Sequence, residues 1–153
     1  MNLLITLEEA IRLEEMVSRC YYLLSMIAPD ESLSWELNKL SLEEKNHVTV
    51  IKTGKDFAFK NPELFGKEAI SDEEIRLGIR LTENLIDDLE QKRVALRPAL
   101  KRVYDLEKKF EAIHMNTAVE FREPSLKQLF DALSKGDAEH RQRLEAILAQ
   151  IVA

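Results

Sequence analysis

The chain has 153 residues, of which 45% are hydrophobic and 33% charged, a composition typical of one globular domain with a sizeable core. Its formal net charge of −6 argues against a nucleic-acid partner, and its four glycines and four prolines are too few for the turns of an all-β protein. The single cysteine, Cys20, excludes a disulfide framework and a four-cysteine metal site.

The N-terminus has no basic region before its short apolar run, so we expect no signal peptide. No stretch approaches the roughly 18 apolar residues of a membrane span. From these features and the one cysteine we predict a cytoplasmic protein with no membrane partner.

The first two predicted elements are amphipathic helices, in which apolar residues recur at alternating spacings of three and four. A capping box at residues 6–9 predicts the start of the first helix, and Pro29 limits its end. The second helix is predicted to begin near Ser32 and to fade toward Gly54. Together they form a predicted hairpin over residues 6–54.

A long crossover, residues 52–94, is predicted to follow, with breakers at Asn61-Pro62 and Gly66. A second capping box at residues 71–74 opens a helical stripe over residues 75–89. We therefore predict an extra helix in the crossover and consider a kinked continuation of it into the next helix.

The last two predicted helices form a second hairpin, residues 97–151. One helix covers about 97–121, with Pro98 in its first turn. The other starts near Ser125, just after Pro124, and runs to the C-terminus.

The two hairpins repeat each other at an offset of 93 residues. In the first predicted helix the apolar stripe consists of Leu7, Ala10, Glu14, Val17 and Tyr21. The equivalent residues in the helix over about 97–121 are Leu100, Val103, Glu107, Phe110 and His114. In the second predicted helix the stripe consists of Leu37, Leu40, Glu44 and His47. The equivalent residues in the helix that starts near Ser125 are Phe130, Leu133, Asp137 and His140. We therefore predict an all-α chain, one domain over residues 1–153, folded as a ferritin-like four-helix bundle made of a duplicated helical hairpin with a long crossover that contains an extra helix.

Carboxylates and histidines interrupt the apolar stripes at matched places. The six residues are Glu14, Glu44, His47, Glu107, Asp137 and His140. Each histidine follows its carboxylate by three residues, so each pair shares one helix face, and antiparallel packing brings the four carboxylates to one level. Four buried carboxylates are strongly unfavourable unless they are neutralised, and two divalent cations would neutralise them.

Oxygen and imidazole ligands favour iron, manganese or zinc over calcium or magnesium. One Glu from each of two helices and a Glu-x-x-His pair from each of two others is the pattern of di-iron and di-manganese bundles. The alternatives are a metal-free bundle with partly solvated carboxylates, acting as an interaction module, and a decayed site.

The same residues carry a resemblance to a known family. The strings LEEMVSRCYYLLS (13–25), LEEKNH (42–47), LEKKFEAIHMNTA (106–118) and GDAEH (136–140) resemble the ferritin-like di-iron domain of rubrerythrins. The resemblance implies a four-helix bundle with a non-haem diiron centre that reacts with hydrogen peroxide or oxygen in a homodimer. The ligand set suits a dimanganese centre as well. It assigns the six stripe residues as metal ligands and matches Tyr21 to a tyrosine beside the metals.

Three departures from the family bear on the activity. The chain lacks the four-cysteine rubredoxin module, so its electrons must come from an external donor such as a rubredoxin. Phe110 stands where rubrerythrin peroxidases carry a second glutamate, and Asp137 replaces a glutamate. We expect a diiron oxidoreductase that reduces hydrogen peroxide or oxygen, with a ferroxidase or iron-handling protein as the alternative.

Several neighbouring residues have competing interpretations. Tyr21 is a candidate catalytic residue that bonds a ligand carboxylate or donates an electron, or it is plain core. His114 is a seventh ligand, a hydrogen-bond partner of a ligand or a core histidine, and we favour the second. Glu15 competes with Glu14 for the first ligand position, but the repeat favours Glu14. Glu111 is expected at a solvated edge and Cys20 as a small buried apolar residue.

Overall fold

The computed structural model describes residues 3–64 and 73–151. These ranges hold five α-helices and one short 3-10 helix: α1 (Leu3–Ile27), α2 (Glu31–Lys60), η1 (Pro62–Leu64), α3 (Glu73–Glu90), α4 (Leu96–Glu120) and α5 (Pro124–Gln150). No β-strand occurs in them, so the all-α prediction is confirmed for this part of the chain. None of the helices in the described ranges combines the length and apolar character that a membrane crossing needs.

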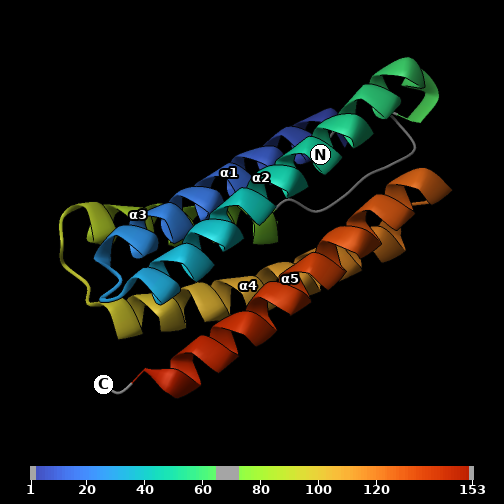
Figure 1. Cartoon of the computed structure of the whole chain (residues 1–153). Coiled ribbons are helices and arrows are strands. Elements are labelled where there is room, and N and C mark those ends of the chain that lie inside the picture. Colours follow the sequence, from blue (N-terminus) through green and yellow to red (C-terminus); the bar gives the residue numbers. More distant parts are fainter. Residues whose placement is uncertain (1–2, 65–72, 152–153) are drawn as a thin grey trace.

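The helices form an elongated bundle (Figure 1). α1 packs along α2 and α4 packs along α5, which gives two helical hairpins, and α3 lies against α1 and α4. The turns from α1 to α2 and from α3 to α4 lie at the end of the bundle where α5 ends, and the turn from α4 to α5 lies at the opposite end (Figure 1).

Local capping explains where two of the helices start. Asp30 is the N-cap of α2, and its Oδ1 accepts a hydrogen bond of 2.8 Å from the backbone N–H of Leu33. Glu123 caps α5 in the same way: its Oε2 accepts a hydrogen bond of 2.9 Å from the backbone N–H of Leu126. Pro124 follows it in the first turn of the helix. The two turns therefore lie where the sequence predicts them.

Three boundaries differ from the sequence prediction. α1 already begins at Leu3, so Thr6 is buried inside the helix and does not cap it. α2 continues through Gly54 to Lys60. This glycine faces a neighbouring side chain, and a Cβ on it would lie 2.5 Å from Leu129 Cδ1. The glycine therefore permits close packing against α5 and does not end the helix.

The third difference lies between α3 and α4, which are separated by a turn and do not form one kinked helix. Lys92 has a φ of 55°, and its N–H bonds the carbonyl of Leu89, while the N–H of Arg93 bonds that of Asp88. These two bonds form a Schellman motif, which ends a helix. Of the capping box predicted at residues 71–74, residues 71–72 lie outside the described residues.

Two apolar clusters fill the bundle and leave a polar layer between them. The larger lies toward the α1–α2 turn and includes Leu24, Leu37 and Leu100. The smaller lies toward the α4–α5 turn and includes Leu3 and Phe130. Along α1, α2, α4 and α5 the predicted carboxylates and histidines fall between these clusters, so the fold places them in the interior of the bundle.

Candidate metal centre

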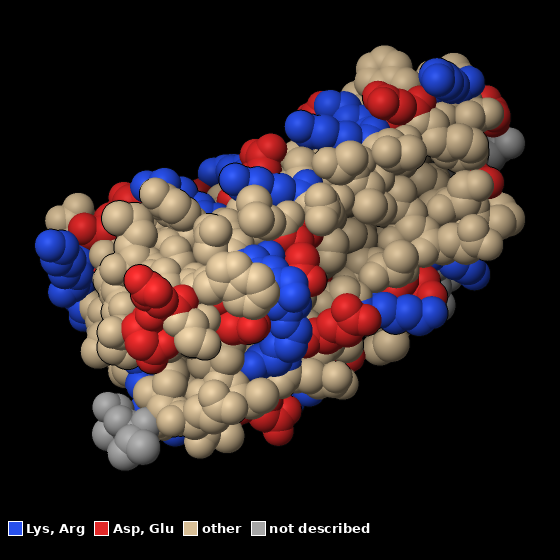
Figure 2. All heavy atoms as spheres, viewed as in Figure 1, with Lys and Arg blue, Asp and Glu red and all other residues tan. Residues whose placement is uncertain are grey.

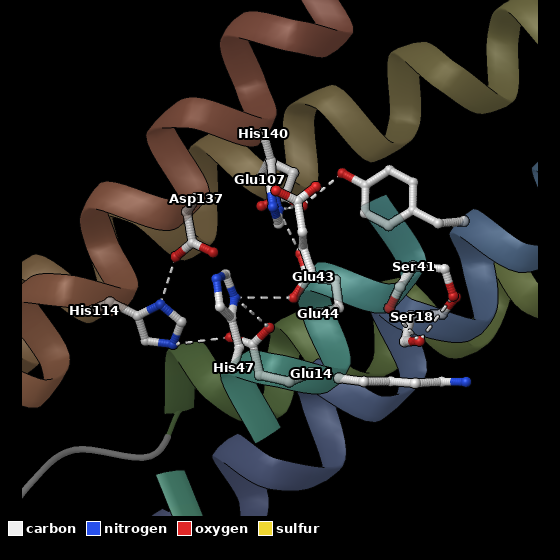
Figure 3. A network of polar contacts seen from close by, with 12 residues as sticks. Glu14, Ser18, Ser41, Glu43, Glu44, His47, Glu107, His114, Asp137 and His140 are labelled. Atoms are coloured by element: carbon white, nitrogen blue, oxygen red, sulfur yellow. Dashed lines mark hydrogen bonds and ion pairs between the residues drawn. The ribbon is translucent and has the colours of Figure 1, made fainter. Parts of the chain in front are cut away.

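The structure brings all six sequence-predicted site residues together from four helices. They are Glu14 on α1, Glu44 and His47 on α2, Glu107 on α4, and Asp137 and His140 on α5 (Figure 3). Five of them are at most 2% exposed, and His47 is the most accessible, with 16% of its side chain exposed. The cluster therefore lies in the core but reaches the surface at one histidine.

One half of the cluster centres on Glu44 and Glu107. His140 Nδ1 lies 2.7 Å from Glu44 Oε1 and 3.4 Å from Glu107 Oε1, so it joins the two hairpins. The hydroxyl of Tyr21 donates a hydrogen bond of 2.6 Å to the same Glu107 oxygen. Tyr21 is fully buried, and its bond to Glu107 is the contact with a ligand carboxylate that the sequence offered as one of several alternatives.

The other half centres on Glu14. His47 Nδ1 lies 3.2 Å from Glu44 Oε2 and 3.5 Å from Glu14 Oε2, without a well-aligned hydrogen bond to either. Its ring stacks on that of His140, with ring centroids 5.2 Å apart and planes 15° from parallel. The two histidines therefore lie side by side across the interface between the hairpins.

His114 joins this half of the cluster from α4. Its Nδ1 lies 2.5 Å from Asp137 Oδ2, and its Nε2 lies 3.6 Å from Glu14 Oε1 (Figure 3). The contact with Asp137 agrees with the sequence interpretation of His114 as a hydrogen-bond partner of a ligand. The contact with Glu14 was not predicted.

The donor atoms fit a metal ion. One ligand atom from each of Glu14, Glu44, His47 and Asp137 forms a set in which all atoms lie within 4.8 Å of one another, and Glu44, His47 and His140 form a second set. Within the described structure, five buried site atoms have no hydrogen-bond partner: Glu14 Oε1, Glu44 Oε2, His47 Nδ1, Glu107 Oε2 and Asp137 Oδ1. Unpaired buried polar atoms are costly, and a metal ion would give a partner to each atom that it binds.

The protonation of the carboxylates reflects the cost of this burial. Burial, together with the neighbouring charge of Glu44, raises the pKa of Glu14 from 4.5 to about 7. Burial and the charges of Glu14 and Glu107 raise the pKa of Asp137 well above its usual range. Glu14 and Asp137 thus resist ionisation in the metal-free protein.

The histidines respond in opposite ways. Burial lowers the pKa of His47, but its contacts with Glu14 and Glu44 outweigh burial and raise the pKa to about 11. Burial also opposes the charge on His140, and contacts with Glu107 and Glu44 raise its pKa to about 10. For His114 burial prevails, and its pKa is lowered. Two imidazolium ions therefore partly neutralise the carboxylates when no metal does so.

The residues that competed for the site lie outside it. Glu15 is exposed, and Glu111 is half-buried and forms an ion pair of 2.9 Å with Arg141. Phe110 is buried and packs toward α3, where a Cβ on Gly78 would lie 2.9 Å from its ring. Cys20 is buried, as predicted, and burial raises the pKa of its thiol to about 12.

Two neighbours of the site were not predicted. Gly136 on α5 lies against the ring of His47, and its only sequence signal is a glycine inside a predicted helix, next to the candidate ligand Asp137. Glu43, beside Glu44, forms an ion pair of 2.6 Å with Arg143 and so joins α2 to α5 near His140.

Figure 2 shows basic and acidic side chains intermixed over one face of the molecule, with no large patch of a single sign on it.

Fold and site together give a helical bundle with a buried cluster of carboxylates and histidines, whose donor atoms lie close enough together to be ligands of a metal ion. Compared with models of protein families, with curated proteins and with solved structures, the chain gives no match.

Proposed function

We propose that the chain is a rubrerythrin-like member of the ferritin-like diiron family, an oxidoreductase that reduces hydrogen peroxide or oxygen with electrons from an external donor. The observation that carries the proposal is the buried cluster of four carboxylates and two histidines with unpaired atoms facing one another. Glu14, Glu44, His47 and Asp137 would hold one metal ion, and Glu44, Glu107 and His140 the other. Two irons there would supply two electrons and open coordination positions.

The internal duplication is part of the proposal. Ser18 and Ser41 exchange hydrogen bonds between α1 and α2, with 2.9 Å from Ser18 Oγ to the carbonyl of Ser41 and 2.8 Å in the reverse direction. At the positions 93 residues later, Ser134 Oγ donates a bond of 3.0 Å to the carbonyl of Glu111. Equivalent helix contacts at equivalent positions support a hairpin that was duplicated.

The chain's own residues have separate tasks in this proposal. Reduction of hydrogen peroxide to two waters consumes two electrons and two protons, and the electrons come from the donor. Tyr21 holds a proton at its hydroxyl oxygen, 2.6 Å from Glu107, where it can be passed on. The two apolar clusters keep bulk water from the site on both sides, and His47, the least buried site residue, marks the shortest way in for a small oxidant.

The first test is the metal content of the protein. Protein loaded anaerobically with ferrous iron and desalted is expected to retain two irons per chain, and loading with manganese in competition decides between the two metals. Glu44→Ala and His140→Ala are expected to lose iron, whereas Glu15→Ala, which changes an exposed neighbour of Glu14, retains it. A wild-type protein that retains no metal would contradict the proposal.

The second test is the reaction itself. Mixing the ferrous protein with hydrogen peroxide is expected to oxidise the iron in the wild type and in Glu15→Ala, and rapid-mixing absorbance records the rate. Addition of a reduced rubredoxin then restores the ferrous state if the donor belongs to that class. Oxidation in Glu44→Ala and His140→Ala at the wild-type rate would remove the assignment.

A ferroxidase that handles or stores iron is the second candidate, and Phe110 favours it. Rubrerythrin peroxidases carry their second glutamate at this position. Here Phe110 is buried and packs toward Gly78 on α3, so it supplies no ligand of that kind. A storage function predicts iron loading beyond two per chain under air with continued oxidation. Saturation at two irons excludes storage and leaves the peroxidase.

A further inference from the structure

His114 is a third histidine at the site, and it comes from α4, where the sequence pattern assigns only Glu107 as a ligand. It is 1% exposed, and it contacts carboxylates from two other helices, Glu14 of α1 and Asp137 of α5. The chain has three histidines in all, so every one of them lies in this cluster.

The distance from His114 to Glu14 is informative. Its Nε2 lies 3.6 Å from Glu14 Oε1, beyond the roughly 2.7–3.2 Å of a hydrogen bond. Two ligand atoms that each lie about 2.1 Å from one ion are separated by about 3.0–3.6 Å. Glu14 Oε1 is fully buried and has no hydrogen-bond partner within the described structure. The pair is therefore spaced as two ligands of one ion.

The other ring nitrogen has the partner that a metal-binding histidine needs. His114 Nδ1 lies 2.5 Å from Asp137 Oδ2, and a ligating imidazole usually donates its second N–H to a carboxylate in this way. That bond orients the ring and leaves Nε2 as the atom that faces Glu14. Asp137 Oδ1 has no partner within the described structure, so Asp137 can hold His114 and bind an ion at the same time.

The equivalent residue of the other hairpin behaves differently. Tyr21 precedes His114 by 93 residues, and its hydroxyl bonds Glu107 at 2.6 Å, whereas His114 lies 3.6 Å from Glu14, the equivalent of Glu107. A tyrosine on one side thus makes a direct hydrogen bond, and a histidine on the other leaves room for an ion. We infer that His114 binds the metal ion next to Glu14 through Nε2, so that the two metal positions are chemically different.

This inference rests on the proposed metal centre, and its test separates the two. The protein is loaded with Co²⁺, which takes the same ligands and shifts the resonances of bound imidazoles far from the ordinary proton spectrum. Because the chain has three histidines, the wild type is expected to give three shifted, exchangeable imidazole N–H signals. Two signals with two Co²⁺ per chain overturn the inference and leave the metal centre intact, and no bound Co²⁺ contradicts both.

Variants assign the third signal. His114→Gln is expected to lose one shifted signal and to weaken one of the two Co²⁺ sites more than tenfold, since loss of a residue that only supports a ligand already costs about 10-fold to 100-fold. Tyr21→Phe is the matched control at the equivalent position of the other hairpin, and it keeps all three signals. If His114→Gln shows the same shifted signals and the same affinity at both Co²⁺ sites as the wild type, the inference is wrong, and if the variant does not fold, the wild-type count alone decides.

Discussion

Gly136 on α5 lies directly against the imidazole of His47 on α2. A Cβ on this glycine would lie 2.6 Å from His47 Nε2 and 2.8 Å from Cε1, distances that require the ring to move. Because the same ring stacks on His140 and faces the carboxylates of Glu14 and Glu44, it has little free space in other directions. The absence of a side chain at position 136 therefore sets the position of a candidate ligand.

Gly136→Ala is accordingly expected to weaken metal binding about tenfold, since displaced support of a ligand typically costs 10-fold to 100-fold in affinity. The matched control is Gly54→Ala, the same exchange inside a helix, where the new Cβ meets only the flexible end of Leu129. Both variants gain helix propensity, so a difference in metal affinity, measured by competition with a chelating dye, isolates the effect on His47. Equal affinities in the two variants would show that the ring adjusts without cost.

Glu14→Gln is predicted to stabilise the metal-free protein while weakening its metal binding. The raised pKa of Glu14, about 7 against 4.5, means that its contribution to stability is complete below pH 4.5 and is lost as the pH rises to 7. A neutral amide avoids that loss, so at pH 8 the chelated variant should be more stable than the wild type by about 1–3 kcal/mol.

Urea unfolding of the chelated proteins at pH 4.5 and pH 8 measures this effect. The variant and the wild type should differ more at pH 8 than at pH 4.5, and the exposed Glu15→Gln should change neither value. A Glu14→Gln protein that is less stable at pH 8 would mean that pairing with His47 outweighs the cost of the buried charge.

Much of the fold follows from the spacing of apolar residues alone. The stripe positions Leu7, Val103, Phe130 and Leu133 are buried as predicted, because a helix that buries one face must place every third or fourth residue in the core. The same arithmetic predicted the shared level of Glu14 and Glu44, since antiparallel helices of known turn position fix which residues lie opposite each other.

What failed depends on contacts that local signals do not record. Thr6 has the sequence of a helix cap, but Leu3 before it packs in the smaller apolar cluster and extends α1 past the signal. Gly54 looks like a helix end, yet it serves close packing against Leu129. The contacts of Gly136 with His47 and of His114 with Glu14 depend on the side-chain register between different helices, and this register is set only by the packed bundle.

Tyr21→Phe tests the predicted catalytic residue. The variant loses the 2.6 Å hydrogen bond to Glu107, and a hydrogen bond to a charged group contributes about 1.5–3 kcal/mol, so its stability should fall by about 2 kcal/mol. Metal content should stay at two per chain, whereas oxidation of the ferrous protein by peroxide should slow at least tenfold if the hydroxyl passes a proton. Cys20→Ala changes the neighbouring buried position and is the control for a loss of packing. If Tyr21→Phe leaves the rate of oxidation by peroxide unchanged, the tyrosine is a core residue without a catalytic role.

Cys20 offers a readout of metal binding that needs no catalysis. Its thiol is buried, and burial, opposed by Arg102 and reinforced by Glu107, raises its pKa to about 12, so the native protein should react slowly with thiol reagents between pH 7 and 9. Labelling then requires opening of the bundle. An ion that binds only the folded chain suppresses that opening, and free metal at 100 times its dissociation constant slows labelling about 100-fold. Chelation of the metal should abolish this protection in the wild type and leave the labelling rate of Glu44→Ala unchanged. A wild-type labelling rate that does not depend on metal would contradict binding to the folded bundle.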